Sequence, residues 1–253
     1  RAYWADVLDC KPEQNFVGGA SSLNLMFDTV SRSFTHGVNG STPWYKLDKV
    51  KFLCSVPGYD RHFAITEHFE IEMINVPMTL EGPDMDMVEE YIKDSTVKGI
   101  WVVPKYSNPQ GITYSHETVA RFAALQPAAP DFVIMWDNAY CIHEFEGEFV
   151  PFEDIISLCE AAGHPNMVYE FASTSKISLA GAGIAAMAAS KANLDFVKKS
   201  MTIQTIGYDK INQLRHVRFF KNIDGLKAHM KKHGDILRPK FEAVLEILDY
   251  ELT

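Results

Sequence analysis

The chain has 253 residues, of which 47% are hydrophobic and 23% charged, as is usual for a globular protein with an ample core. Its formal net charge of −9 argues against nucleic acid as a partner. The four cysteines lie far apart without a C-x-x-C pair, which favours a reducing cytoplasm and indicates neither a disulfide scaffold nor a metal site. No apolar run approaches the roughly 18 residues of a membrane span. We therefore expect a cytoplasmic protein that binds no nucleic acid, membrane or metal.

Strand-like and helix-like segments alternate along the chain, which predicts an α/β domain with a largely parallel sheet. Strands are expected at residues 51–55, 71–76, 99–103, 132–136 and 167–171. Helical patterns begin at residue 22 and after residue 62, and continue at residues 84–92, 115–125 and 153–161. Ser115 is the expected N-cap of one of these helices. After residue 187 the pattern is helical to the end.

A lysine follows the strand expected at residues 167–171, where Ser173-Thr-Ser-Lys176 leads into a glycine-rich turn. Burial disfavours a charged ammonium, so a lysine in this place is costly unless it is used or paired. The hydroxyls of Ser173 and Ser175 can donate hydrogen bonds to an anion. A lysine of lowered pKa beside anion-binding groups is what Schiff-base chemistry with a carbonyl needs. The alternative is an ordinary lysine of a surface loop.

Three more polar clusters fall beyond the carboxyl ends of expected strands, where ligands gather in such sheets. Gly19 and its neighbours precede a helix, where free amides would hold a phosphate, although many such caps bind nothing. Asn108 lies in Tyr106-Ser-Asn-Pro-Gln-Gly111, which is equally compatible with a plain Pro-Gly turn. Asp137 ends an apolar strand, where an ionised carboxylate needs a cationic partner or donors unless it caps the next helix.

The motifs Asn108-Pro-x-Gly111, Asp137-x-Ala-Tyr140 and Ser173-x-Ser-Lys176 together resemble those of fold-type I pyridoxal-phosphate aminotransferases of class I/II. The resemblance runs from about residue 17 to residue 187, and it is strongest to the divergent bacterial aspartate aminotransferases. It implies a three-layer α/β/α large domain with a mostly parallel sheet. It also implies pyridoxal 5'-phosphate as the cofactor, amino acids and 2-oxo acids as substrates, and a homodimer.

The resemblance assigns the chemistry at the cofactor ring. Lys176 would hold the cofactor and, once displaced by substrate, shuttle a proton at the substrate Cα. Asp137 would pair with the pyridine nitrogen and keep it protonated, with His62 behind it. Tyr59 would stack on the ring.

The resemblance also implies how the rest of the cofactor is bound. Tyr140 and Asn108 would bond the ring oxygen. The phosphate would be held by the hydroxyls of Ser173 and Ser175 and by the amides of Gly19, Ala20 and Ser21. Most of the family carries a phosphate-binding arginine eight residues after the lysine, and here that position is Ile184.

The activity implied by this resemblance is transfer of an amino group between aspartate or glutamate and a 2-oxo acid. Cofactor residues do not decide which Cα bond breaks, so a pyridoxal-phosphate-dependent lyase or decarboxylase is one alternative. An amino-acid-sensing effector domain of a transcription regulator is another. No residue can be assigned as the clamp of the substrate carboxylate, and the arginines to test are Arg61, Arg215 and Arg218.

The two ends of the chain indicate a fragment truncated at both ends. The first residue is Arg1, and the last segment carries an apolar stripe without a helix stop signal: Phe241, Val244, Leu245, Ile247 and Leu248. We expect a cofactor-binding large domain at residues 1–225 and, at residues 226–253, a helix leading towards an absent small domain. Such a chain would bind the cofactor weakly and would not turn over aspartate. The alternative is that the last helix packs onto the large domain and the chain is complete.

Overall fold

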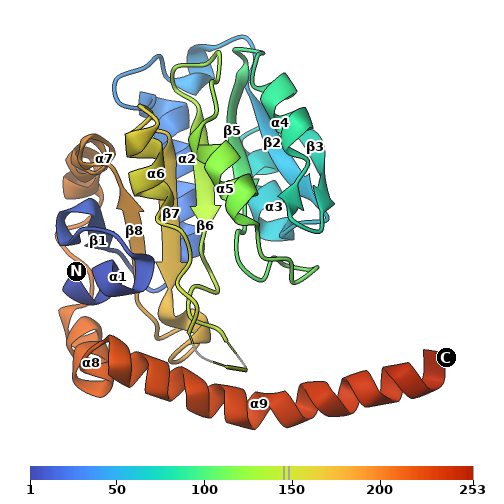
Figure 1. Ribbon diagram of the computed structural model, residues 1–253. Helices are drawn as coiled ribbons and strands as arrows, with labels where there is room; N and C mark the ends of the chain where they lie inside the picture. Colours follow the sequence, from blue (N-terminus) through green and yellow to red (C-terminus); the bar gives the residue numbers. More distant parts are fainter. Residues whose placement is uncertain (145, 148, 253) are drawn as a thin grey trace.

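The computed structural model describes residues 1–144, 146–147 and 149–252, which are built around one sheet of eight strands (Figure 1). The strand order is β1-β8-β7-β6-β5-β2-β3-β4. The strands are β1 (Asn15–Val17), β2 (Lys51–Val56), β3 (Glu72–Thr79), β4 (Gly82–Pro83), β5 (Val97–Val102), β6 (Val133–Asp137), β7 (Val168–Ser173) and β8 (Ala185–Ala189). The pairs from β3 through β2, β5 and β6 to β7 are parallel, whereas β1, β4 and β8 run antiparallel to their neighbours. The expectation of a mostly parallel sheet is confirmed.

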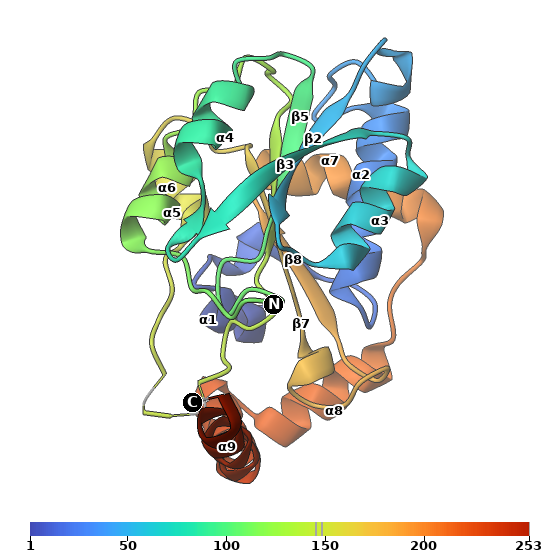
Figure 2. The same cartoon turned by 90° about the vertical axis from the view of Figure 1, so that its right-hand side faces the viewer.

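Helices cover both faces of the sheet and form the outer layers of an α/β/α sandwich (Figure 2). One face carries α2 (Ser22–His36), α3 (Asp60–His68) and α7 (Lys191–Gln204). The other carries α1 (Ala2–Leu8), α4 (Met85–Tyr91), α5 (His116–Ala123) and α6 (Ile155–Ala161). Short 3₁₀ turns lie at Pro12–Gln14, Trp44–Lys46 and Thr174–Lys176.

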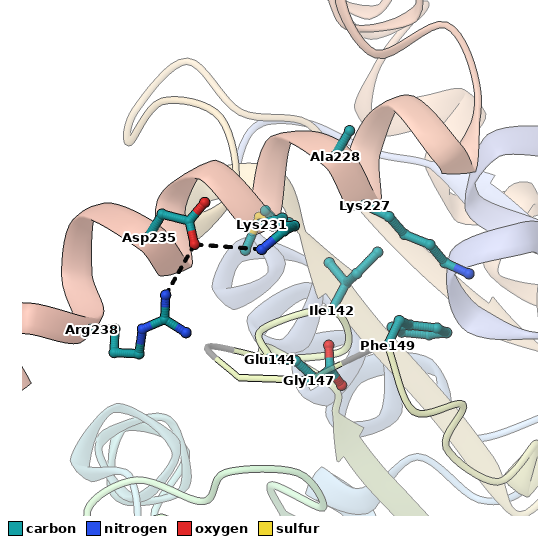
Figure 3. Close-up of a pocket in the computed structure, with 10 residues that line it drawn as sticks. Ile142, Glu144, Gly147, Phe149, Lys227, Ala228, Lys231, Asp235 and Arg238 are labelled. Carbon is teal, nitrogen blue, oxygen red and sulfur yellow. Dashed lines mark hydrogen bonds and ion pairs between the residues drawn. The ribbon is translucent and has the colours of Figure 1, made fainter.

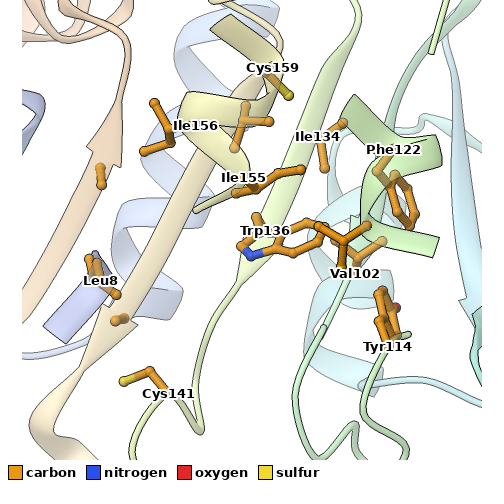
Figure 4. Packing of buried hydrophobic residues seen from close by; sticks show 14 of the residues in the cluster. Leu8, Val102, Tyr114, Phe122, Ile134, Trp136, Cys141, Ile155, Ile156 and Cys159 are labelled. Atoms are coloured by element: carbon orange, nitrogen blue, oxygen red, sulfur yellow. The ribbon is translucent and has the colours of Figure 1, made fainter. Parts of the chain in front are cut away.

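The core is divided by the sheet into two clusters of buried side chains. On the α5–α6 side, Trp136 of β6 is fully buried beneath Phe122 and Ile155 (Figure 4). On the other side, Met26 of α2 and Leu194 of α7 are equally buried. Because both faces of these parallel strands are buried, their sequences are continuous apolar runs.

Two further helices, α8 (Lys210–Phe220) and α9 (Ile223–Leu252), lie at the end of the molecule where β7 finishes (Figure 1). Leu226 and Met230 of α9 join the core, so the predicted boundary at residue 225 falls inside this helix. Farther along, Val244, Leu245 and Ile247 are exposed. In the part of the chain that the structure describes, no helix is both long enough and apolar enough to cross a membrane.

The expected strands and helices are present with ends shifted by a few residues. Ser115 caps α5, since its hydroxyl accepts a hydrogen bond from Thr118 N at 3.2 Å. The strands β1, β4 and β8 and the helix α1 were not expected. β8 reads Ala-Ala-Met-Ala-Ala, a run of good helix formers, and pairing with β7 and β1 overrides that propensity.

Candidate active site

The predicted site residues gather at one edge of the sheet because neighbouring parallel strands end there. Asp137 is the last residue of β6 and Ser173 the last residue of β7. Tyr59 follows β2 and Asn108 follows β5. Since β2, β5, β6 and β7 are consecutive in the sheet, these segments meet although they are distant in sequence.

Asp137 is buried, with 4% of its surface exposed, and its two carboxylate oxygens differ. Oδ2 lies 3.0 Å from His62 Nε2. Oδ1 is buried and has no hydrogen-bond partner among the described residues. A buried carboxylate oxygen without a donor is costly, so this atom fits a site for a cationic N–H such as a protonated pyridine.

His62 is held in place by aromatic neighbours. Its ring stacks on Trp101 of β5 at a centroid distance of 4.6 Å and an interplanar angle of 12°. The Tyr59 ring contacts it edge-on at 5.1 Å. His62 therefore lies beside Asp137 with its ring fixed by two aromatic side chains. Asn108 is exposed, and it lines a small cavity together with Tyr59 and His62.

Two tyrosines lie near Asp137 as intact phenols. Burial raises the pKa of Tyr140, and the charge of Asp137 raises it further. The pKa of Tyr59 is raised for the same two reasons. Both side chains are therefore hydrogen-bond donors at neutral pH.

Lys176 ends a 3₁₀ turn directly after β7, and its side chain is exposed in this chain. The expectation that this ammonium is buried is therefore wrong for the described residues, because the turn lies outside the sheet edge. The Nζ atom stands 5.1 Å from the centroid of the Tyr140 ring. This cation–π contact directs the amine towards the end of β6.

The glycine loop before α2 lies against the residues that precede Lys176. Ser175 Oγ donates to Ala20 O at 3.2 Å and lies 3.0 Å from Ser173 Oγ. Ala185 N donates to Gly19 O at 2.8 Å, which ties the loop to β8. The structure thus brings together the two segments that carry the predicted phosphate-binding groups.

The start of α2 fits an anion. Ser21 is the N-cap of this 15-residue helix, and within the described chain its hydroxyl forms no capping bond. The first amides of α2 and the helix dipole are therefore available to a phosphate. Gly18 lies close to the first turns of this helix: a Cβ there would lie 2.7 Å from Leu25 Cδ2, so the Leu25 side chain would have to move to admit a larger residue.

The resemblance implies a phosphate-binding arginine at position 184, where this chain has isoleucine. The side chain of Ile184 is 6% exposed and lines a narrow gap with Tyr3 and Trp4 of α1 and His216 of α8. The candidate clamp arginines Arg61, Arg215 and Arg218 are all exposed. Arg215 and Arg218 line a cavity of about 540 Å³ beside α8, and neither is placed against Asp137.

Another cavity, of about 350 Å³, lies between α9 and the segment after β6 (Figure 3). It is lined by the cations Lys227, Lys231 and Arg238, and Asp235 contacts two of them, Lys231 at 3.5 Å and Arg238 at 3.2 Å. None of the predicted cofactor residues lines it.

Sequence reasoning missed two residues beside the site. Trp101 was predicted only as part of a strand. Nothing in the sequence around His62 indicated that Trp101 stacks on it. His143 follows Tyr140 by three residues, and its ring contacts the Tyr140 ring edge-on at 5.4 Å. Burial lowers the pKa of His143 to about 4, so it is neutral at pH 7. The sequence signal that could have identified His143 is its position three residues after the Asp137-x-Ala-Tyr140 motif.

The chain is similar to known proteins both in sequence and in fold. The sequence matches the family model described as aspartate amino-transferase over residues 1–253. An aspartate aminotransferase of Corynebacterium glutamicum is 51% identical over 254 residues, which is 100% of this chain and 59% of that relative. The crystal structure of an aspartate transaminase from C. glutamicum has a TM-score of 0.96 and 50% identity, covering 99% of this chain and 59% of the other.

A more distant structure shares the fold. The alpha-aminoadipate aminotransferase of Thermus thermophilus, complexed with N-(5'-phosphopyridoxyl)-L-leucine, has a TM-score of 0.77 and 22% identity, covering 100% of this chain and 60% of the other. The chain thus spans about three fifths of the length of these relatives.

Proposed function

The chain belongs to the aspartate amino-transferase family, and from this premise we propose that the protein is a pyridoxal-phosphate-dependent transaminase that moves an amino group between aspartate or glutamate and a 2-oxo acid. The observation that carries the proposal is Asp137, whose Oδ2 is bonded to His62 while the buried Oδ1 has no donor in the described part of the chain. The C. glutamicum relatives, named aspartate aminotransferase and aspartate transaminase, support this substrate class over the lyase and sensor alternatives.

Bound pyridoxal phosphate would supply a protonated pyridine ring that accepts the electron pair left when the substrate Cα loses its proton. Asp137 would hold the proton on the ring nitrogen through Oδ1. His62 keeps the carboxylate in that orientation, and Trp101 fixes His62 by stacking. Tyr59 contacts the His62 ring edge-on, and we assign it to stacking on the face of the cofactor ring.

Lys176 is the residue we assign to covalent attachment of the cofactor and to the proton at the substrate Cα. Its side chain is exposed, and its contact with the Tyr140 ring directs it towards the end of β6. Tyr140, a protonated phenol, would donate a hydrogen bond to the ring oxygen, with Asn108 as the second donor.

The phosphate would be held without the family's arginine. We assign the phosphate to the amides of Gly19, Ala20 and Ser21 and to the hydroxyls of Ser173 and Ser175. The contact of Ser175 Oγ with Ala20 O at 3.2 Å and with Ser173 Oγ at 3.0 Å supports this assignment. A helix N-terminus with several donors is an adequate anion site, although it binds less strongly than one with a guanidinium.

We further propose a homodimer in the cytoplasm. The resemblance to dimeric family members supports the homodimer. The four free, buried cysteines support a reducing compartment such as the cytoplasm. Sedimentation equilibrium of the full-length protein should give twice the mass of one chain, and a mass of one chain would reject the dimer.

An amino-acid panel tests the activity. The full-length protein loaded with cofactor should form oxaloacetate from aspartate and 2-oxoglutarate, measured by coupling to a dehydrogenase. Release of ammonia or carbon dioxide from the amino acid without a 2-oxo acid acceptor would instead identify a lyase or decarboxylase. Binding of amino acids without any product would identify a sensor.

A further inference from the structure

Two residues that flank Lys176 contact the same buried histidine of α8. His216 is 8% exposed, and its Nε2 lies 3.1 Å from Thr174 Oγ1 and 2.8 Å from Ser178 Oγ. Thr174 is fully buried and begins the 3₁₀ turn that Lys176 ends. His216 therefore contacts the chain just before and just after the lysine.

The second ring nitrogen fixes the tautomer of His216. Nδ1 lies 2.9 Å from the main-chain oxygen of Asn212, which can only accept, so Nδ1 carries the proton of the neutral ring. Nε2 is then an acceptor, and the hydroxyl of Ser178 or Thr174 donates to it. The ring thus makes directional contacts that an apolar ring of the same size cannot make.

Asn212, one turn earlier on α8, holds the other end of the same loop. Its side-chain amide donates to the main-chain oxygens of Ala182 and Gly183, each at 3.0 Å. The neck of the loop is closed by Thr174, whose N–H donates to Ile184 O and whose Oγ1 accepts from Ile184 N, each at 2.9 Å. Asn212 and His216 therefore bind both ends of the loop from one face of α8.

The loop is also packed tightly against itself. A Cβ on Gly183 would lie 3.0 Å from Ser175 N and 3.1 Å from Thr174 Oγ1. From α9, His229 Nε2 lies 2.9 Å from Ile177 O. The turn that carries Lys176 thus has contacts on three sides, although the lysine side chain itself is exposed.

We propose that His216 is a positioning residue for Lys176: by accepting a hydrogen bond from the residues that flank the lysine, it fixes the turn from which the amine reaches the reacting carbon. The inference rests on the proposed function in that Lys176 is the reacting amine. A displacement of about 1 Å in such a group costs roughly a hundredfold in rate, so a small shift of the turn has a large effect.

The competing explanation is that His216 only fills space. Its ring lies 6.0 Å from the ring of Phe220, and it lines the gap beside Ile184. The two explanations differ in what His216→Phe and His216→Gln do. Phenylalanine keeps the volume and removes the acceptor, whereas glutamine keeps an acceptor in a smaller side chain.

Three measurements on the full-length protein separate the explanations. The first is the rate at which formaldehyde and cyanoborohydride methylate Lys176 in the protein without cofactor, followed by mass spectrometry. The second is the pH titration of the absorbance of the bound cofactor. The third is the separation of kcat from KM. His36→Phe is the control, because His36 is exposed at the end of α2.

His216→Phe should lower kcat about tenfold or more with KM nearly unchanged, and should shift both the methylation rate and the absorbance titration. His216→Gln should restore most of each value. If the phenylalanine variant matches the wild-type protein, or if both variants are equally impaired in proportion to lost thermal stability, His216 only packs and the inference is wrong.

A variant that does not fold leaves the inference testable. Ser178→Ala removes one hydroxyl from the same contact and changes little volume, so it should shift the methylation rate of Lys176 in the same direction as His216→Phe. If His216→Phe does not fold, an unchanged methylation rate in Ser178→Ala would reject the inference. Failure of the proposed function would appear differently, as a wild-type protein that turns over no amino acid, and the methylation comparison holds even then.

Discussion

His62 Nε2 lies 3.0 Å from Asp137 Oδ2, and this contact leaves Asp137 Oδ1 as the buried oxygen that a ligand must satisfy. The two residues come from α3 and from the end of β6, and the side chains of both are almost fully buried. A carboxylate held in this way cannot turn to solvent, so its charge is available at one fixed point of the site.

Replacement of Asp137 tests that charge. Asp137→Asn keeps the shape and removes the negative charge, so cofactor should still bind while deprotonation of the substrate Cα slows on the order of a thousandfold. The measurement is exchange of the Cα hydrogen of aspartate for deuterium, followed by NMR. Asp195→Asn, which changes an exposed ion pair on α7, should leave exchange unchanged. Near-normal exchange in Asp137→Asn would remove Asp137 from the mechanism.

His62 should matter through its hydrogen bond more than through its ring. His62→Phe keeps an aromatic ring against Trp101 but leaves Asp137 Oδ2 without its donor, a loss of about 1–3 kcal/mol or roughly tenfold to a hundredfold in kcat. His62→Gln retains an N–H donor and should recover part of the rate. A near-normal rate in His62→Phe, with His62→Gln the slower variant in steady-state assays, would mean that stacking, rather than the hydrogen bond, is what His62 contributes.

The sequence predicted the parallel part of the sheet, because strand patterns are local features. That Asp137, His62, Tyr140 and the phosphate segments lie in one site was implied by the resemblance to the family, which rests on the order of the motifs. The sequence did not predict β8, whose alanines prefer a helix until β7 and β1 pair with them. It also did not predict that Lys176 is exposed. Side-chain exposure depends on what covers a turn, and that cannot be read from the residues of the turn itself.

Contacts between segments that are distant in sequence could not be predicted either. The stacking of Trp101 on His62 joins residues on two different elements, and no spacing in the chain indicates it. The same holds for His216, which is 42 residues from Thr174. Such partners become visible only when the register of the strands and the packing of the helices are known.

Covalent labelling tests Lys176 directly. The full-length protein incubated with pyridoxal phosphate and reduced with borohydride should carry the pyridoxyl group on the peptide that contains Lys176. Lys176→Ala should abolish the label, whereas Lys191→Ala, which changes an exposed side chain on α7, should not. A label on another lysine of the wild-type protein would contradict the assignment.

Ile184→Arg should not restore the family's phosphate ligand. The side chain at this position is buried against α1 and α8, so an arginine there places an unpaired charge in the core and should lower the free energy of unfolding by about 3–5 kcal/mol. Cofactor affinity, measured by fluorescence titration, should not rise. Ile211→Arg on the exposed face of α8 should change stability by less than about 0.5 kcal/mol. Tighter cofactor binding in a stable Ile184→Arg protein would contradict the placement.

Glu170 should make the protein less stable as pH rises. Burial raises the pKa of this β7 carboxyl to about 8, although the hydrogen bond from Asn138 Nδ2 at 2.9 Å lowers it. In the unfolded chain the pKa of a glutamate is about 4.3, so between about pH 4.3 and 8 the folded state keeps a proton that the unfolded state has released. Stability therefore falls through this window, by a few kcal/mol in order of magnitude.

Glu170→Gln removes the titrating group while keeping an oxygen for the Asn138 bond. The variant should match the wild-type protein near pH 5 and be the more stable of the two near pH 8, because only the wild-type chain gains free energy on ionising when it unfolds. Urea unfolding at intervals from pH 5 to pH 9 measures the difference, and groups that titrate equally in both proteins cancel. Glu160→Gln, at an exposed position of α6, should give no pH-dependent difference. A stability difference between Glu170→Gln and the wild-type protein that is the same at both ends of the range would show that Glu170 is ionised in the fold.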